Sequence, residues 1–361
     1  MDLEARLRGF QVAGAFRGAV TAGGGHINDT WFVDLDEDGA ERRVVLQRLN
    51  PLVFPDPAAV MANMDRVTRH LRAKLTAEGA PDAGRRALRL LPTQSGGTFL
   101  TDGDGAAWRC VAFIPRARTF ETVQGAQHAF EAARAIGGFL SRLADLGGPP
   151  LHEVIPGFHD TPARLAALRA AAAADRAGRA KDAADALAFA DAHAALAEAI
   201  PVRRLPVRPV HNDTKLANVM MDEATGEGLC VIDLDTVMPG CALHDFGDLV
   251  RSAVSPTAED AAEVRVDLVL FEALARGFLQ GCAGLLTPEE RAHLAQAPAV
   301  ITYELGLRFL ADHLTGDPYF RITRPHQNLA RARAQFALVA AMEDDGGQMS
   351  TILDREARNS A

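Results

Sequence analysis

Lysine is scarce in this 361-residue sequence: among 38 basic residues it occupies only Lys74, Lys181 and Lys215. The other basic residues are arginines, which indicates a codon bias in favour of arginine. Any reaction that needs a lysine ammonium group therefore has three candidates. Acidic residues exceed basic ones by 47 to 38, a formal net charge of −9. This charge repels nucleic-acid backbones and anionic lipid, so we expect neither nucleic acid nor membrane as a partner.

Cysteines and long apolar runs are also scarce. The four cysteines form no CxxC pair and have no histidine at zinc-like spacing, which predicts buried thiols in a reducing compartment. No apolar run reaches the roughly 18 residues of a membrane span, and the charged start "MDLEARLRGF" differs from a signal peptide. The sequence therefore predicts a soluble cytoplasmic protein. Its length suits two or three packed units.

The first 115 residues have the pattern of a small antiparallel sheet. Strand-like runs flank the turn "DEDG" at 36–39, and further short runs are separated by "SGG" and "DGDG". Between these two groups, residues 57–75 place apolar side chains at three- and four-residue spacing, which predicts one amphipathic helix. We therefore expect residues 1–115 to form a β-rich lobe.

Helical patterns dominate from residue 116 onward. We expect a helical lobe over 116–345 and a partly disordered tail over 346–361. The predicted helical segments are 124–146, 161–200 as a hairpin broken near 175–180, 258–280, 288–314 and 326–342.

The strongest functional signal lies in residues 208–240, "RPVHNDTKLANVMMDEATGEGLCVIDLDTVMPG". Two apolar runs flank a turn-rich segment and predict a hairpin, with Asp213 and Asn218 before it and Asp233 after it. Phosphoryl transfer needs one carboxylate to orient the attacking hydroxyl, and an amide and a second carboxylate to hold Mg²⁺. A solvated turn would explain the segment around Asp213 alone, and a strand-end cap would explain Asp233 alone. Neither explains both at this spacing. The predicted roles are Asp213 as general base, Asn218, Asp233 and Asp235 as metal ligands, and Lys215 as electrostatic support.

This stretch resembles the loops of the kinase-like phosphotransferases, the superfamily of aminoglycoside phosphotransferases and choline kinases, in its H-x-D-x-x-x-x-N loop and following I-D strand. More narrowly, "HNDTKLANVM", "VIDLDTVMPG" and "DFGDLVR" look like bacterial N-acetylhexosamine 1-kinases. Segments at 23–30, 46–57, 158–165 and 304–320 extend the resemblance over most of the chain. It implies an α+β, two-lobed, protein-kinase-like fold, in which residues 1–115 form the nucleotide-binding lobe and residues 116–345 carry the catalytic loop and the substrate pocket. It also implies Mg²⁺ as cofactor, ATP as co-substrate, and a monomer or weak homodimer.

A glycine-rich turn precedes the second strand-like run. Glycine lets backbone N–H groups approach phosphates because no Cβ intervenes. A plain β-turn explains the glycines alone, whereas beside the catalytic loop they favour a nucleotide-covering loop. The resemblance also implies that His26 and Asn28 lie near the sugar or phosphate end. The glycines are Gly23, Gly24 and Gly25.

The strand at 42–50, "RRVVLQRLN", has no lysine where protein kinases pair one with the nucleotide phosphates. Alternation places Gln47 and Arg48 on opposite faces of this strand. Gln47 is the positional match for this lysine and Arg48 is the chemically better one. Arg43 is a third option, and the fourth is that no residue takes the role. The expected hinge is 112–117, "AFIPRA", where backbone groups around Phe113 and Pro115 could pair with adenine, although a simple connecting loop gives the same sequence.

The acceptor must reach Asp213, so we expect the helical lobe to line its pocket. An arginine and a tyrosine in an apolar helix and turn, such as Arg308 and Tyr319, usually satisfy each other within the protein core. The resemblance to N-acetylhexosamine 1-kinases implies instead that they contact the sugar. Further polar candidates, equally well explained by a helix N-cap ahead of Pro162, are His159, Asp160 and Arg164.

The segment 244–251, "HDFGDLVR", contains the three letters that hold magnesium in protein kinases. Asp233 follows Asn218 by one hairpin length, whereas Asp245 comes 12 residues later, after the chain has turned away. We therefore predict that Asp245 and Asp248 open a helix and, with His211, support the catalytic loop from behind.

The sequence thus predicts an ATP-dependent kinase, with the anomeric hydroxyl of an N-acetylhexosamine as the acceptor and a sugar 1-phosphate as the product. The first alternative is a kinase for another small alcohol, such as an aminoglycoside, choline, ethanolamine or homoserine. The second alternative is a catalytically inactive nucleotide-binding module, against which the intact Asp213, Asn218 and Asp233 argue.

Overall fold

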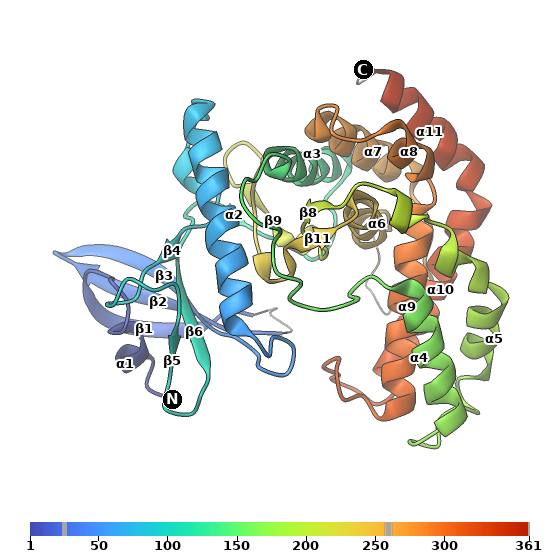
Figure 1. The fold of residues 1–361 in the computed structure, drawn as a ribbon, viewed down its shortest axis with the longest axis horizontal. Helices are drawn as coiled ribbons and strands as arrows, with labels where there is room; N and C mark the ends of the chain where they lie inside the picture. Colours follow the sequence, from blue (N-terminus) through green and yellow to red (C-terminus); the bar gives the residue numbers. More distant parts are fainter. Residues whose placement is uncertain (24–26, 256, 258–260, 262, 360–361) are drawn as a thin grey trace.

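The computed structural model describes residues 1–23, 27–255, 257, 261 and 263–359. The chain forms a β-rich lobe followed by a larger, mainly helical lobe (Figure 1). The two-lobed α+β fold predicted from the sequence is therefore confirmed. The chain starts with the short helix α1 (Leu3–Leu7) at the β-rich lobe and ends in the helical lobe.

The β-rich lobe is built on one antiparallel sheet with the order β1-β2-β3-β6-β4, and β5 also pairs with β6. The predicted hairpin at 36–39 is confirmed: Asp38 and Gly39 form its turn with φ of 53° and 84°, the left-handed conformation that a tight hairpin requires. One face of the sheet buries an apolar core that includes Val33 and Leu46. The strands are β1 (Ala15–Thr21), β2 (Asp29–Glu37), β3 (Ala40–Arg48), β4 (Leu90–Leu91), β5 (Leu100–Thr101) and β6 (Ala107–Ala112).

Helix α2 (Pro57–Ala77) stands between the sheet and the helical lobe (Figure 1). It starts as the sequence predicts, because the Asp56 side chain accepts a hydrogen bond from the Ala59 N–H at 3.1 Å. Its apolar residues at three- and four-residue spacing are buried. The buried Asn63 donates to the backbone oxygens of His152 and Val237, at 2.8 and 3.0 Å. Helix α2 is thereby tied to the lobe that carries the catalytic loop.

The helical lobe packs around the neighbouring helices α3 and α7, which run in the same direction. Glycines allow the close approach: a Cβ on Gly137 would lie 2.4 Å from the Phe278 carbonyl oxygen, and one on Gly277 would lie 2.2 Å from that of Phe130. The helices of this lobe are α3 (Ala126–Leu143), α4 (Thr161–Ala174), α5 (Ala184–Ala192), α6 (Ala242–Ala253), α7 (Leu268–Cys282), α8 (Pro288–His293), α9 (Ala297–Thr315), α10 (Gln327–Asp344) and α11 (Gly346–Asn359).

Two small sheets lie between the lobes, near α3 and α6 (Figure 1). The hairpin predicted around the turn at 222–228 is confirmed by the pairing of β9 with β10. The three-stranded sheet contains β7 (Ala117–Arg118), β9 (Val219–Asp222) and β10 (Gly228–Val231). The two-stranded sheet contains β8 (Arg208–Val210) and β11 (Met238–Gly240).

Two helical expectations were wrong. The segment predicted as one helix over 288–314 divides into α8 and α9, because Pro298 cannot continue the hydrogen-bond ladder and instead lies in the first turn of α9. The tail that was expected to be partly disordered is helix α11 up to Asn359, where Met349, Ile352 and Leu353 are buried at helical spacing. The helix predicted over 258–280 is described from Leu268, where Asp267 caps α7, and residues 258–260 and 262 lie outside the described residues.

The broken helical hairpin over 161–200 is confirmed by α4 and α5. All four cysteines are buried and unpaired, as the sequence predicts. In the part of the chain that the structure describes, every helix is too short or too polar to cross a bilayer.

Candidate active site

The loop after β8 is held from behind by helix α6. Asp245 accepts hydrogen bonds from the backbone N–H groups of His211 at 2.8 Å and Asn212 at 2.7 Å. Asn212 has a left-handed φ of 67°, and its side chain donates to the Thr236 carbonyl oxygen at 2.9 Å. These contacts hold an otherwise unfavourable backbone conformation next to Asp213.

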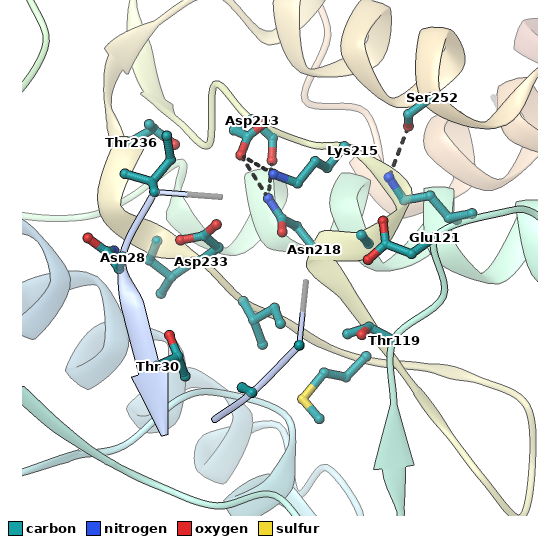
Figure 2. A pocket seen from close by; sticks show the side chains of 18 of the residues that line it. Asn28, Thr30, Thr119, Glu121, Asp213, Lys215, Asn218, Asp233, Thr236 and Ser252 are labelled. Atoms are coloured by element: carbon teal, nitrogen blue, oxygen red, sulfur yellow. Dashed lines mark hydrogen bonds and ion pairs between the residues drawn. The ribbon is translucent and has the colours of Figure 1, made fainter. Parts of the chain in front are cut away.

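Asp213, Lys215 and Asn218 converge in one cluster (Figure 2). The Lys215 ammonium donates to Asp213 Oδ2 at 3.1 Å, and the Asn218 amide nitrogen donates to the same oxygen at 3.1 Å. Burial raises the pKa of Asp213, but Lys215 and His211 outweigh it and lower the pKa to about 2. Asp213 is therefore ionised at neutral pH. Among the described residues, no donor contacts its Oδ1, which is left to accept a hydroxyl hydrogen.

Asp233 follows β10 and is brought back beside Asn218 by the hairpin, because the Ile232 N–H donates to the Asn218 carbonyl oxygen at 2.9 Å. Burial raises the pKa of Asp233, and the carboxylate of Asp235 adds to this effect although Lys215 opposes it. Within the described residues, the Asp233 carboxylate has no hydrogen bond and no ion pair. A buried carboxylate in this situation is one that a cation would stabilise.

The donor set at Asn218 and Asp233 fits a magnesium ion. The Asn218 nitrogen is used by Asp213, which leaves the amide oxygen as a ligand next to the Asp233 carboxylate. In nucleotide sites, Mg²⁺ is held by one or two protein oxygens, and phosphate and water oxygens complete its coordination. The described residues contain no cluster of three or more His, Cys, Asp or Glu side chains that could hold a metal. The pair therefore suits a metal that is bound together with phosphates.

Asp235, predicted as a further metal ligand, has other partners. Its side chain is 2% exposed and forms a bidentate ion pair with Arg109, in which the Nη2–Oδ2 distance is 3.0 Å. Asn28 donates to the same carboxylate at 2.6 Å. Both carboxylate oxygens of Asp235 are therefore engaged by protein donors, whereas its role as a metal ligand stays a prediction.

A cavity of about 990 Å³ runs from the sheet past the catalytic cluster to α9 and α10. The predicted nucleotide-binding residues divide into three groups. The cavity is lined by Gly23, Gln47 and Phe113. Its described lining does not include Arg48 or Pro115. The remaining two, Gly24 and Gly25, lie outside the described residues.

The two residues absent from the lining have structural partners. Arg48 donates to Asp29 at 2.9 Å on the outer face of the sheet, because alternation along β3 turns it away from Gln47. The Pro115 carbonyl oxygen accepts from Arg85 at 2.9 Å. Of the three candidates for the role of the missing lysine, Gln47 and Arg43 line the cavity, whereas Arg48 does not belong to its described lining.

Arg308 and Tyr319 line the far end of the cavity. Phe158 also lines the cavity. The Arg308 guanidinium lies over the rings of Phe158 at 5.0 Å, Phe320 at 5.5 Å and Tyr319 at 5.9 Å. In the described part of the chain it has no carboxylate partner. Of the other predicted sugar contacts, His26 lies outside the described residues, and the Asn28 amide is used by Asp235 and the Asn50 N–H.

His159 is a supporting residue that the sequence treats only as a polar candidate. Its ring lies 2.8 Å from Glu304 and 3.0 Å from the Asn212 carbonyl oxygen. Burial lowers the pKa of His159, but Glu304 outweighs it and raises the pKa, so the charged ring can donate to both. No local pattern predicts this contact, because Glu304 is 145 positions away along the chain. Asp160 is the N-cap of α4, one of the two interpretations given above.

The described part of α6 also places Asp248 in an ion pair with Arg251, at 2.8 Å. Both side chains are buried, and the Oδ2 atom of Asp248 has no hydrogen-bond partner. Asp248 therefore pairs with a residue of its own helix. It does not contact the loop N–H groups that donate to Asp245.

We predict that Asp245→Asn changes stability in a pH-dependent way. Burial raises the pKa of Asp245 to about 6, whereas a carboxyl group in the unfolded chain titrates near pH 4. The folded state therefore binds the proton more tightly, and the stability contributed by this carboxyl is present below about pH 4 and is lost as the pH rises through 6. The measured quantity is the difference between the free energies of unfolding of the two proteins, wild type minus Asp245→Asn. This difference should fall by about 3 kcal/mol between pH 4 and pH 7.5.

Urea unfolding of both proteins at several pH values measures this difference. Glu223→Gln, on the exposed turn of the β9–β10 hairpin, is the matched control and should show a pH-independent difference from wild type. A wild-type advantage over Asp245→Asn that grows with pH would contradict the prediction.

Comparison with known proteins adds a family and a fold. The family model described as "Phosphotransferase enzyme family" matches residues 19–279. A microcompartment-associated aminopropanol kinase is 17% identical, with a TM-score of 0.57 and coverage of 96% of this chain and 98% of that one. Spectinomycin phosphotransferase, solved with ADP and spectinomycin, is 12% identical, with a TM-score of 0.57 and coverage of 92% and 94%.

A third similar structure is the aminoglycoside phosphotransferase of Alicyclobacillus acidocaldarius. It is 14% identical, with a TM-score of 0.57, and the alignment covers 96% of this chain and 97% of that chain. At these identities the three structures establish a shared fold over nearly the whole length.

Proposed function

The chain belongs to the phosphotransferase enzyme family, and from this premise we propose that it is an ATP-dependent kinase that phosphorylates the anomeric hydroxyl of an N-acetylhexosamine. The observation that carries the proposal is the shared cavity of Asp213, Asn218 and Asp233, which extends from the sheet to Arg308. One end offers space for a nucleotide and the other for an acceptor, with the reactive carboxylate between them.

Each residue of the cluster has a chemical role in this proposal. Asp213 accepts the hydrogen bond of the attacking hydroxyl through its free oxygen and takes the proton as transfer proceeds. The Asp213 carboxylate raises the pKa of Lys215, which therefore remains protonated and counters negative charge on the transferred group. Asn218 and Asp233 would hold Mg²⁺. When bound, this ion would counter the negative charge of the nucleotide phosphates.

The charge of the cavity favours an uncharged acceptor over a cationic one. Its described lining contains three acidic side chains, and two of them, Asp213 and Asp233, belong to the catalytic cluster. Arginines line the acceptor end, where Arg308 is held against three aromatic rings. A choline, ethanolamine or aminoglycoside ammonium would approach these arginines with unfavourable charge. A sugar hydroxyl or acetamido oxygen would instead accept their hydrogen bonds.

An ADP-release screen with Mg-ATP tests the proposal. Hexoses, N-acetylhexosamines, amino alcohols, homoserine and aminoglycosides are offered at equal concentration, and phosphorus NMR of the product identifies the phosphorylated position. We expect the highest kcat/KM with an N-acetylhexosamine and a product phosphorylated at the anomeric oxygen. Activity with amino alcohols and none with sugars would replace this proposal by the alternative of an amino-alcohol kinase.

We predict that Arg308→Gln raises the KM for the sugar by about 10- to 100-fold, because a charged hydrogen bond contributes about 1.5–3 kcal/mol. The KM for ATP should remain unchanged, since Arg308 lies at the opposite end of the cavity from Phe113. Arg333→Gln on α10, which removes a surface ion pair with Asp185 of α5, is the control. Steady-state kinetics with each substrate varied in turn measure the effect. Equal rises in both KM values would show that Arg308 acts on the fold instead of on the acceptor.

A further inference from the structure

The β-rich lobe contacts the catalytic region through a buried arginine. Arg109 lies on β6, directly opposite Gln47 of β3, and its side chain is 1% exposed. Its guanidinium makes the bidentate ion pair with Asp235 described above, although the two residues are 126 positions apart. The pair therefore joins a strand of the sheet to the turn that follows Asp233.

Further hydrogen bonds extend this contact into a network. Arg109 Nε donates to the Gln47 side-chain oxygen at 2.8 Å, and the Gln47 nitrogen donates to Thr30 Oγ1 at 3.0 Å. On the other side, Asn28 donates to Asp235 at 2.6 Å and accepts from the Asn50 N–H at 2.9 Å. We name the four residues Asn28, Gln47, Arg109 and Asp235 the interlobe clasp.

Stability alone is a weak explanation for the clasp. A buried ion pair loses the hydration of both ions, and its replacement by apolar residues of similar volume is often neutral or stabilising. The clasp instead has a consequence for geometry. Asp235 lies in the short turn Leu234–Thr236 directly after Asp233, whose backbone has a left-handed φ of 59°. A fixed Asp235 therefore fixes the direction in which the Asp233 carboxylate points.

The clasp also bears on the missing lysine. Protein kinases place a lysine on the third strand and hold it with a helix glutamate. Within the described lining, the basic residues that the sheet contributes to the cavity are Arg43 and Arg109. Arg43 pairs with Asp34 on the exposed side, at 2.6 Å. Arg109 is the cation on the strand next to β3, and its carboxylate partner comes from the catalytic lobe.

We propose that Arg109 and the interlobe clasp take over the positioning role of the absent lysine, by holding the sheet and Asp233 in the arrangement that binds the magnesium nucleotide. This inference rests on the proposed function, since it concerns the same nucleotide site. Arg109 is a positioning residue: it is too buried to be a phosphate ligand and acts through Asp235.

The double variant Arg109→Met with Asp235→Leu tests the clasp. Either single variant leaves a buried partner unpaired and should lower the midpoint of thermal unfolding, whereas the double variant should regain most of it. Affinity for Mg²⁺ with a non-hydrolysable ATP analogue is measured by calorimetry, independently of any acceptor. We expect at least a tenfold loss of affinity in the double variant, and a matching rise in the Mg²⁺ concentration that gives half-maximal activity.

The exposed ion pair between Arg17 and Asp36 on the same sheet provides the matched control. Arg17→Met with Asp36→Asn should change neither nucleotide affinity nor the Mg²⁺ dependence. Arg109→Lys, which retains the charge but makes one contact instead of two, is the second test variant if the double variant fails to fold. It should bind nucleotide more weakly than wild type while unfolding at a similar temperature.

The outcomes separate this inference from the proposed function. Wild-type nucleotide affinity in the folded double variant, or in Arg109→Lys, would overturn the clasp as a positioning device and leave it a structural contact. If wild type binds the magnesium nucleotide but phosphorylates none of the acceptors, the proposed acceptor fails and the binding measurements still decide the clasp. If wild type binds no nucleotide, both proposals fail.

Discussion

Asp213→Asn is expected to lower kcat by about 10²–10⁴-fold, the usual contribution of a general base. Asparagine keeps the shape of the side chain and one acceptor oxygen, so the contacts of Lys215 and Asn218 change little. It has no carboxylate to take the proton of the attacking hydroxyl. The measurement is the steady-state rate of ADP release with the best acceptor from the screen, together with the thermal unfolding midpoint. A folded Asp213→Asn protein with wild-type turnover would exclude this residue as the base.

The pH dependence of activity provides a control for this assignment. The pKa of Asp213 is about 2 because Lys215 and His211 stabilise its charged form against the effect of burial. Protonation of Asp213 therefore cannot reduce activity until the pH falls toward 2, far below the neutral range. An acidic limb between pH 5 and 7 that disappears in Asp213→Asn but persists in Glu223→Gln would contradict the low pKa.

Asp233→Asn is expected to combine a large loss of activity with a gain in stability. Loss of a magnesium ligand removes several kcal/mol of transition-state stabilisation, which corresponds to a fall in kcat/KM on the order of 10³-fold. Burial and the neighbouring carboxylates raise the pKa of Asp233, so the charged side chain destabilises the folded protein when no metal is bound. The neutral amide removes this repulsion.

Thermal unfolding with and without the magnesium nucleotide measures both effects. Without ligand, Asp233→Asn should unfold at a higher temperature than wild type. With ligand, wild type should gain stability and the variant should gain little, since a bound ligand stabilises only the state that binds it. Glu223→Gln, on the same hairpin but exposed, is the control. A variant that is less stable than wild type without ligand would show that Asp233 has a structural partner in the fold.

Short-range patterns were sufficient to predict much of the fold and the composition of the cluster. The spacing of Asp213, Asn218 and Asp233 depends on one loop and one hairpin, and the hairpin pairs as expected. Strand alternation on β3 correctly left only one of Gln47 and Arg48 on the cavity side. The catalytic and metal roles stay predictions, because they depend on ligands and rates.

Errors arose where a helix depends on distant contacts. The tail predicted as disordered is polar on average, but its three apolar residues are spaced to pack, and α11 lies against α7. No composition-based argument can detect that partner. The break between α8 and α9 has a local cause instead, because Pro298 has no N–H group to continue the helix and is accommodated in the first turn of α9.

The sequence was enough to predict which residues gather at the candidate site of this phosphotransferase, because those residues are close along the chain and their backbone patterns are local. It could not show what holds them in place. Asp235 pairs with Arg109, Asp213 follows a backbone turn held by Asp245 and His159, and Arg308 is stacked between rings from two segments. Each of these contacts joins residues that are far apart along the chain. Their formation depends on burial and on packing between lobes and helices, which no local pattern encodes.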